Sequence, residues 1–474
     1  MGSIATAPPF TVLRDTKPED TTMPAFMVST TRGFLPRQEP IIQLPAEFDA
    51  LESILTRMPI KTLDGMPGLL ATFTLGETVL KELPDLTSAI NKYKDNLPLM
   101  NAIYRDYSFL ASAYLLEPCH ERYLKGEGYG LGRQTLPAVI ALPISRCAEL
   151  AGFKPFMEYA GSYALFNYRL EDPNKGLEYD NLRLIRAFEH GLDPKSSEAG
   201  FVLVHVDMVQ NSGPLVDGVV SALDACESND REAFNVGMEK VVTSMTKVNK
   251  VMDETPEIDS LGGMWGKSKP GDYISFRTFI FGITSQSMFP HGVVYEGVSE
   301  EPMSFRGESE VQIPLCDNLL QIAMPDTPLT AILQDFRSYR PGNHREFLEY
   351  VRSRSTLLSL RSYALQDPTS TAFYLQALDQ VRDFRWRHWT FTREYILKKT
   401  AHPVATGGSP IVTWLPNQLQ AVLNAMVDVW EGNGKQGLGK KCEEIMEFAI
   451  QQKETLTKEV QKYCEERNVD VKKV

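Results

Sequence analysis

Apolar residues recur every three or four positions along most of this chain. Phe48, Leu51, Ile54 and Leu55 are an early example. This spacing places apolar side chains on one face of a helix, so we expect amphipathic helices between residues 48 and 150. The same spacing predicts further helices over residues 177–191, 214–228, 231–252, 328–352, 354–366, 368–399, 415–432 and 438–468.

Strict alternation of apolar and polar residues, which is typical of a half-buried strand, is scarce. The short apolar runs 202–206 and 276–283 contain strand-like residues, but their helical surroundings place them on helices. The expected fold class is therefore mainly α. We predict three parts: a mobile N-terminal arm over 1–25, a smaller helical domain over 26–150, and a large C-terminal helical bundle over 151–474.

Charge and cysteine content narrow the possible functions. The 474 residues include 49 Lys and Arg against 61 Asp and Glu, a net charge of −12. Such an acidic chain lacks the basic surface of a nucleic-acid-binding protein, so we expect small-molecule chemistry and no nucleic-acid partner. The six cysteines form no CxxC pair, which disfavours structural zinc. No run of about 18 apolar residues occurs, so we expect a cytoplasmic protein without an integral membrane segment.

His388 stands out among the seven histidines. On the predicted helix 368–399 it shares an apolar stripe with Phe384 and Phe391, at steps of four and three. Two interpretations remain open: a core histidine bonded to a neighbouring helix, or a neutral imidazole that serves as the axial ligand of a haem. Arg385 lies one turn earlier, where it suits either a haem propionate or a salt bridge.

Three further places combine a polar or flexible feature with apolar surroundings. His205 lies in the apolar run 201–208, where simple burial in the core is the first interpretation. Arg277 interrupts an aromatic stretch, and a guanidinium in such surroundings usually holds a carboxylate, either of the protein or of a ligand. Residues 405–410 form a glycine-containing segment that suits a lid or a connector.

An ordered set of motifs resembles the indoleamine 2,3-dioxygenase family, haem enzymes that cleave the C2–C3 bond of indole. The resemblance covers about residues 27–430. Its motifs, in chain order, are RGFLP at 32–36, LPAVIALP at 136–143, DPNK at 172–175, VYEG at 294–297, YRP at 339–341, HREFL at 344–348, and the stretch from His388 to Gly408. Each motif is weak alone, whereas the ordered set is specific.

The resemblance implies a haem held by the large domain, in the form of haem b with ferrous iron when active. His388 matches the proximal ligand of the haem iron. Arg385 matches a residue that contacts a haem propionate, and Asp317 is expected to brace it.

The same resemblance implies a substrate site on the opposite, distal side of the haem. Tyr159 would line the pocket, and Arg277 would grip the substrate carboxylate. His205 would be catalytic as the acceptor of a hydrogen bond from the indole N–H, at a position where mammalian members have serine and the related tryptophan 2,3-dioxygenases place a histidine on the distal side. The loop that closes over the substrate would contain Thr406, Gly407 and Gly408.

The function implied is a 2,3-dioxygenase that uses O2 to open L-tryptophan, or a close indole, to N-formylkynurenine, in a chain expected to be a monomer. The chain departs from the family pattern in two segments, so two alternative functions stay open. The segment 305–314 is shorter and more acidic than is usual in the family, and the stretch before Arg277 is one residue shorter than in mammalian members. A specialised-metabolism oxygenase acting on a modified tryptophan or another aromatic amino acid is the second hypothesis. A haem sensor or carrier without turnover is the third.

Overall fold

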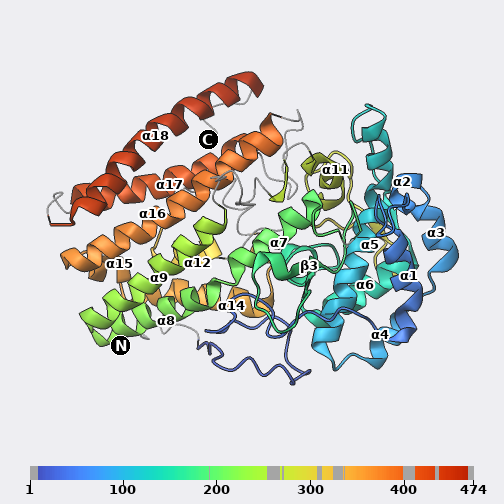
Figure 1. Cartoon of the computed structure of the whole chain (residues 1–474), viewed down its shortest axis with the longest axis horizontal. Helices are drawn as coiled ribbons and strands as arrows, with labels where there is room; N and C mark the ends of the chain where they lie inside the picture. Colours follow the sequence, from blue (N-terminus) through green and yellow to red (C-terminus); the bar gives the residue numbers. More distant parts are fainter. Residues whose placement is uncertain are drawn as a thin grey trace.

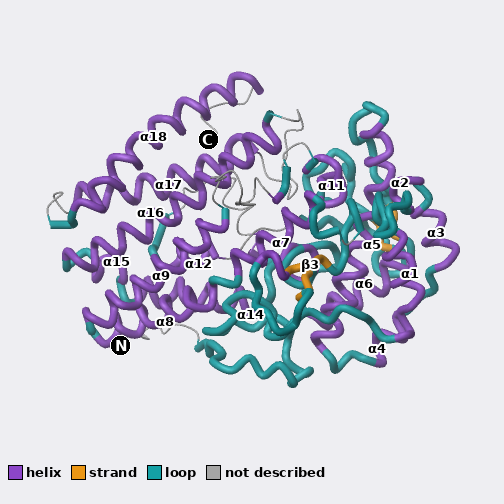
Figure 2. The backbone as a smooth tube through the Cα atoms, viewed as in Figure 1, coloured by secondary structure: helices purple, strands orange, loops and turns teal. Residues whose placement is uncertain are grey.

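The computed structural model describes residues 9–191, 193–252, 267–269, 272–306, 312–323, 335, 337–398, 411–432 and 437–467. Of these residues, 61% lie in helices and 4% in strands, which confirms the mainly α prediction. The earliest helices gather at one end of the molecule and the last ones at the other (Figure 1). Figure 2 shows that the short strands lie in the end formed by the earlier part of the chain.

The N-terminal part is built around one long helix, α5 (Leu97–Leu124). The side chain of Asn96 caps it by accepting a hydrogen bond from the Leu99 backbone N–H. Apolar residues occur all round this helix, so it is buried on nearly every face as far as His120. The elements around it are η1 (Ala46–Phe48), α1 (Asp49–Arg57), α2 (Leu69–Thr72), α3 (Leu75–Glu82), α4 (Thr87–Lys92) and α6 (Ala138–Ala151).

Residues 16–24 wrap around Arg37, whose side chain is 1% exposed. Its guanidinium donates hydrogen bonds to backbone carbonyl oxygens within this segment, at Thr16, Lys17, Asp20, Met23 and Pro24. These bonds attach the segment to the body of the protein. The mobility of the arm and the division into two domains remain predictions.

The described strands form two small sheets. β1 (Thr135–Leu136) pairs in parallel with β4 (Val294–Tyr295), and β2 (Tyr168–Leu170) pairs antiparallel with β3 (Leu182–Leu184). The predicted helix over 177–191 is therefore wrong: a 3-10 turn, η3 (Tyr179–Asn181), leads into β3 instead.

The side chain of Asn181 and the alternate burial of two leucines explain why this segment is not helical. The amide of Asn181 donates to the carbonyl oxygens of Asp172 and Gly176, which ties the segment to the neighbouring loop. Leu182 and Leu184 are then buried on one side of the strand. Both interactions depend on partners outside the segment, so its own sequence pattern does not predict them.

The middle of the chain supplies the elements that link the two ends. Residues 202–206 are helical, as expected, within α7 (Ser197–Val209). The expected helix over 276–283 is right only in its first part, because α11 (Tyr273–Arg277) and η4 (Thr278–Ile280) are followed by extended chain. The remaining elements are the π-helix η2 (Tyr159–Tyr163), α8 (Ser212–Ser228), α9 (Arg231–Val251), α12 (Gln312–Leu319), α14 (Gly342–Leu357) and α15 (Leu360–Ala364).

The C-terminal end is a helical bundle (Figure 1). It contains α16 (Pro368–Phe391), which continues as the π-helix η5 (Thr392–Leu397), and then α17 (Ile411–Gly432) and α18 (Lys440–Arg467). Asp367 caps α16 by accepting a hydrogen bond from the Ser370 backbone N–H. Among the described helices, none has the length and apolar character needed to cross a bilayer.

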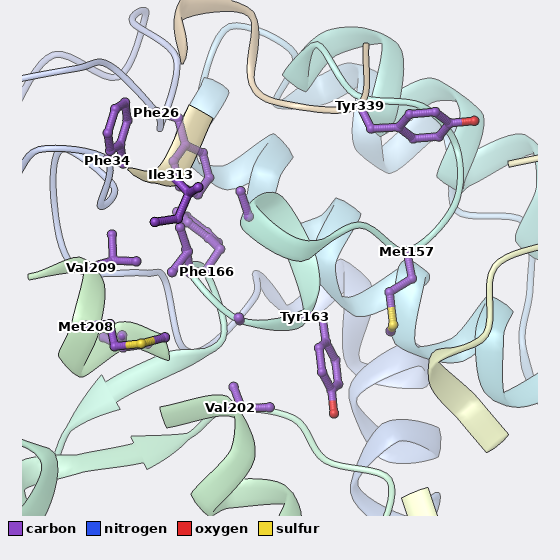
Figure 3. Close-up of a cluster of buried hydrophobic side chains, with 14 of the residues drawn as sticks. Phe26, Phe34, Met157, Tyr163, Phe166, Val202, Met208, Val209, Ile313 and Tyr339 are labelled. Atoms are coloured by element: carbon purple, nitrogen blue, oxygen red, sulfur yellow. The ribbon is translucent and has the colours of Figure 1, made fainter. Parts of the chain in front are cut away.

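A buried apolar cluster joins the N-terminal segment to the middle of the chain (Figure 3). The rings of Phe26 and Phe166 lie 5.9 Å apart within it. Val202 of α7 and Tyr163 of η2 belong to the same core, and both are buried. This packing fixes α7, which carries His205, against η2, which carries Tyr159.

Candidate active site

His388 lies on α16 among residues that are otherwise buried or half-buried. Between Ser370 and Leu397 it is the one exposed residue in this fully described stretch. Many protein atoms lie near the ring although part of the residue is exposed, and the desolvation that they cause, followed by the nearby His205, lowers its pKa to about 4. The imidazole is therefore neutral at physiological pH and faces a space that solvent reaches. It offers the nitrogen lone pair that an iron ligand needs.

Arg385 lies one turn before His388 and is 3% exposed. Its Nη2 atom donates to both carboxylate oxygens of Asp317 on α12, at 2.9 and 2.7 Å. Burial raises the pKa of Asp317, and the guanidinium opposes that effect. The Nε of Arg385 is buried with no hydrogen-bond partner among the described residues. An orphaned donor beside an accessible neutral histidine fits the acidic edge of a haem, so the residues present fit that cofactor.

His205 faces the same region from α7. Its Nδ1 atom lies 2.7 Å from the carbonyl oxygen of Phe201, one turn earlier. A carbonyl oxygen only accepts hydrogen bonds, so Nδ1 carries the proton and Nε2 is the acceptor of the neutral ring. Burial lowers the pKa of His205 to about 4, which keeps the ring neutral.

Aromatic rings surround His205. Tyr159 and Phe201 both contact it edge to face, with ring centroids 5.4 and 5.1 Å away. Tyr159 comes from the π-helix η2, an irregular helix type that is common at functional sites. The structure thus brings together Tyr159, His205 and His388, three of the residues that the sequence singled out.

Arg277 is fully buried at the end of α11. Its guanidinium lies 4.8 Å from the ring of Phe281 and interacts with the hydroxyls of Tyr129 and Tyr273. Burial raises the pKa of both tyrosines, and Arg277 opposes that rise. Because Arg277 has no exposed surface, a substrate carboxylate reaches it only if one of the covering side chains moves.

Phe201 connects the Arg277 helix to the His205 helix. Its ring lies 5.3 Å from Tyr273 and 5.8 Å from Phe276, both on α11. Tyr273 in turn contacts Tyr395 of η5 at 5.7 Å. The elements that carry Arg277, His205 and His388 therefore meet through one group of aromatic rings.

Gly200 allows the backbone at Lys267 to pack closely against α7. A Cβ atom at this position would lie 1.7 Å from the carbonyl oxygen of Lys267, so no larger residue fits. The Lys269 backbone N–H donates to the Ser197 hydroxyl on the same face of α7. This close approach places the segment that leads into α11.

Two buried glutamates, which sequence reasoning did not select, tie α7 and α11 together. Glu198 accepts hydrogen bonds from the backbone N–H groups of Phe188 and Glu189 at 2.8 and 2.7 Å, and Glu189 accepts one from the Glu198 N–H. The other Glu189 oxygen lies 2.6 Å from the hydroxyl of Ser275 on α11. Burial raises the pKa of Glu198 to about 8, so this carboxyl is protonated at neutral pH. The sequence does contain one signal for Glu198: it is a charged residue that lies two turns before His205 in an otherwise apolar helix.

Thr406, Gly407 and Gly408 lie outside the described residues, as do residues 307–311 of the shortened segment. Among the residues that the structure covers, no group of three or more His, Cys, Asp or Glu side chains is placed to hold a metal ion. Haem binding does not require such a group, because one axial side chain is enough to ligate the haem iron. The individual roles assigned to the site residues remain predictions.

Known proteins resemble this chain over most of its length. The family model described as indoleamine 2,3-dioxygenase matches residues 22–457. Indoleamine 2,3-dioxygenase 2 of Homo sapiens is 28% identical over 355 residues, which cover 73% of this chain and 82% of that protein.

Fungal relatives extend the match. Indoleamine 2,3-dioxygenase qulI of Penicillium citrinum is 25% identical over 447 residues, covering 90% of this chain and 93% of that protein. The indoleamine 2,3-dioxygenase of Saccharomyces cerevisiae is 26% identical over 352 residues, covering 68% of this chain and 73% of that protein. The chain therefore belongs to the indoleamine 2,3-dioxygenase family and is an oxidoreductase, a haem-dependent dioxygenase.

Proposed function

We propose that this enzyme opens the indole C2–C3 bond of L-tryptophan with O2 to give N-formylkynurenine. The observation that carries the proposal is the placement of His388 of α16 and His205 of α7, two neutral imidazoles close enough for one to affect the pKa of the other. One suits an iron ligand and the other suits a substrate acceptor. Family membership supports haem-dependent chemistry on an indole with O2.

His388 would hold the cofactor, haem b in its ferrous form, through the unprotonated ring nitrogen. When bound, the haem supplies the site at which O2 is activated. Arg385 has a buried Nε–H available for a propionate, and Asp317 fixes its guanidinium through both carboxylate oxygens.

His205 would orient the substrate. Its Nε2 accepts the indole N–H, because Nδ1 donates to the Phe201 carbonyl. The surrounding rings of Tyr159 and Phe201 exclude water and favour stacking with a flat aromatic ligand. Holding the indole in one orientation contributes to catalysis because reacting atoms are kept in contact.

Arg277 would bind the substrate carboxylate by a charge-assisted pair once the ring of Tyr129 or Tyr273 moves aside. The loop with Thr406, Gly407 and Gly408 would then close over the amino acid. Both roles come from the family resemblance and from the position of Arg277 at the end of α11.

The test is a reconstitution assay with the full-length protein. Wild type should show a haem Soret band, which His388→Ala should lose or alter, and ferrous enzyme with L-tryptophan and O2 should form N-formylkynurenine. A normal band in His388→Ala would refute the haem assignment. Haem binding without product would refute the substrate.

A second candidate keeps the haem site and changes the substrate to a modified tryptophan or another aromatic amino acid. The segment 305–314, which is shorter and more acidic than is usual in the family, favours this alternative. Consumption of such a compound in the same assay, with L-tryptophan untouched, would establish it. A haem sensor or carrier is not proposed, because the relatives are dioxygenases. The monomeric state and cytoplasmic location stay predictions.

A further inference from the structure

The last helix, α18, runs parallel to α16 at a constant offset of 70 residues. Arg382 Nη1 donates to Gln452 Oε1 at 2.6 Å, and Arg467 Nη2 donates to the Leu397 carbonyl oxygen at 2.9 Å. Both pairs are separated by 70 positions. A register that holds from Arg382 to Leu397 spans the whole neighbourhood of His388. α18 therefore contacts the helix of the expected iron ligand before and after that residue.

Among the described residues, Glu459 makes the hydrogen bonds between α18 and the helix of His388 that lie nearest to His388 in sequence. Its Oε2 accepts a hydrogen bond from the indole Nε1 of Trp389 at 2.7 Å, again 70 residues away. Its Oε1 pairs with the guanidinium of Arg393, one turn further along. The Trp389 side chain is fully buried, and the Glu459 side chain is 24% exposed. One carboxylate thus holds the residue next to His388 and the start of the π-helix that follows.

The geometry of a helix explains why these contacts matter for His388. Neighbouring residues on a helix are separated by about 100° of rotation, so fixing Trp389 against α18 fixes the direction in which His388 points. The α-helix changes to a π-helix just beyond Phe391, and Arg393 lies within this π-helix. Arg467 binds the carbonyl of Leu397, the last residue of η5.

We propose that Glu459 is a positioning residue for the haem ligand: by holding Trp389 and Arg393 it sets the orientation of His388 from the C-terminal helix. The proposal rests on the proposed role of His388. It assigns to α18 a part in cofactor binding that goes beyond covering the bundle. Side chains that orient a metal ligand typically change metal affinity 10- to 100-fold when they are removed.

The test compares three substitutions in the full-length haem protein. Glu459→Gln removes the charge that pairs with Arg393, and Trp389→Phe removes the indole N–H while keeping a buried ring. Glu454→Gln makes the same chemical change on an exposed position of α18 and serves as the control. The readouts are the rate of haem transfer to an acceptor protein, the ferrous iron–histidine stretching band in resonance Raman spectra, and the ferric/ferrous midpoint potential.

We expect Glu459→Gln and Trp389→Phe to lose haem about tenfold faster than wild type, at the low end of the effects above. Their iron–histidine band and midpoint potential should also shift, while Glu454→Gln behaves as wild type. Haem properties equal to those of the control would overturn the proposal, even if the unfolding midpoint of Glu459→Gln falls. Trp389→Phe decides the question if Glu459→Gln fails to fold. An absent iron–histidine band in wild type, or an unchanged one in His388→Ala, would instead show that the assignment of His388 has failed.

Discussion

The protonated Nδ1 of His205 points at the Phe201 carbonyl oxygen, 2.7 Å away and one turn earlier on α7. This hydrogen bond sets the tautomer, and with it the chemistry available on the other side of the ring. Nε2 is left to accept, so the ring matches a ligand that presents an N–H group. Under the proposed function, this N–H group would be that of the substrate indole.

Replacing His205 by Phe should lower kcat/KM for L-tryptophan about 2- to 13-fold, the factor expected for one net hydrogen bond of about 0.5–1.5 kcal/mol. A substrate methylated on the indole nitrogen cannot donate, so wild type should discriminate against it and His205→Phe should not. Steady-state kinetics on both compounds measure this effect. His291→Phe, at an exposed histidine, is the control. Unchanged discrimination in His205→Phe would refute the acceptor role.

Arg277→Met should raise KM for L-tryptophan about 10- to 150-fold, because a hydrogen bond to a charged group contributes about 1.5–3 kcal/mol. Tryptamine lacks the carboxylate, so its kinetics should hardly change. Parallel assays with the two compounds separate substrate binding from structure. An equal loss with both would show that Arg277 supports Tyr129 and Tyr273 and does not bind the substrate.

Sequence periodicity predicted the long helices well because their apolar stripes are local. The predicted helix over 415–432 corresponds to α17 (Ile411–Gly432), and the one over 438–468 to α18 (Lys440–Arg467). His388 was found for the same reason, since a polar residue in an apolar stripe is visible in the sequence alone. Its exposure within a buried helix is a property of packing and required the structure.

The errors and omissions arise where distant segments decide the outcome. Residues 177–191 contain helix-like spacing, yet Asn181 and the pairing of β2 with β3 impose extended chain. Glu198 and Glu189 looked like ordinary charged residues until their backbone partners were known. The 70-residue register between α16 and α18 likewise cannot be predicted from the sequence of either helix alone.

Asp317→Asn should destabilise the folded protein by about 3–5 kcal/mol, because it leaves the buried Arg385 guanidinium without its counter-charge. Denaturant unfolding of the apoprotein measures this change. The control is Asp217→Asn, which breaks an exposed pair with Lys240 and should cost no more than about 1 kcal/mol. Equal stability of the two variants would mean that Asp317 does not compensate a buried charge.

Gly200→Ala should displace the segment at Lys267 or destabilise the protein by at least about 1–3 kcal/mol, the usual cost of overpacking. Because that segment leads into α11, KM should rise more than the unfolding midpoint alone would explain. Gly176→Ala, at a glycine with nothing near its Cβ position, is the matched control. Wild-type kinetics and stability in Gly200→Ala would show that the contact with Lys267 is not required.

The buried carboxyl of Glu198 should make folding stability depend on pH. Burial raises its pKa in the folded protein from 4.5 to about 8, so between these values the folded state keeps a proton that the unfolded chain releases. Its contribution is complete below pH 4.5 and is lost as the pH rises to about 8. The free energy of unfolding should fall by no more than about 1.4 kcal/mol per pH unit across this window.

Glu198→Gln should remove that slope, since an amide does not titrate and still accepts the backbone N–H groups of Phe188 and Glu189. Urea unfolding of wild type and variant at several pH values measures the difference. Glu239→Gln on the exposed face of α9 should keep the wild-type slope. Parallel pH profiles for wild type and Glu198→Gln would mean that Glu198 is ionised in the fold, and that the link between α7 and α11 is a charged one.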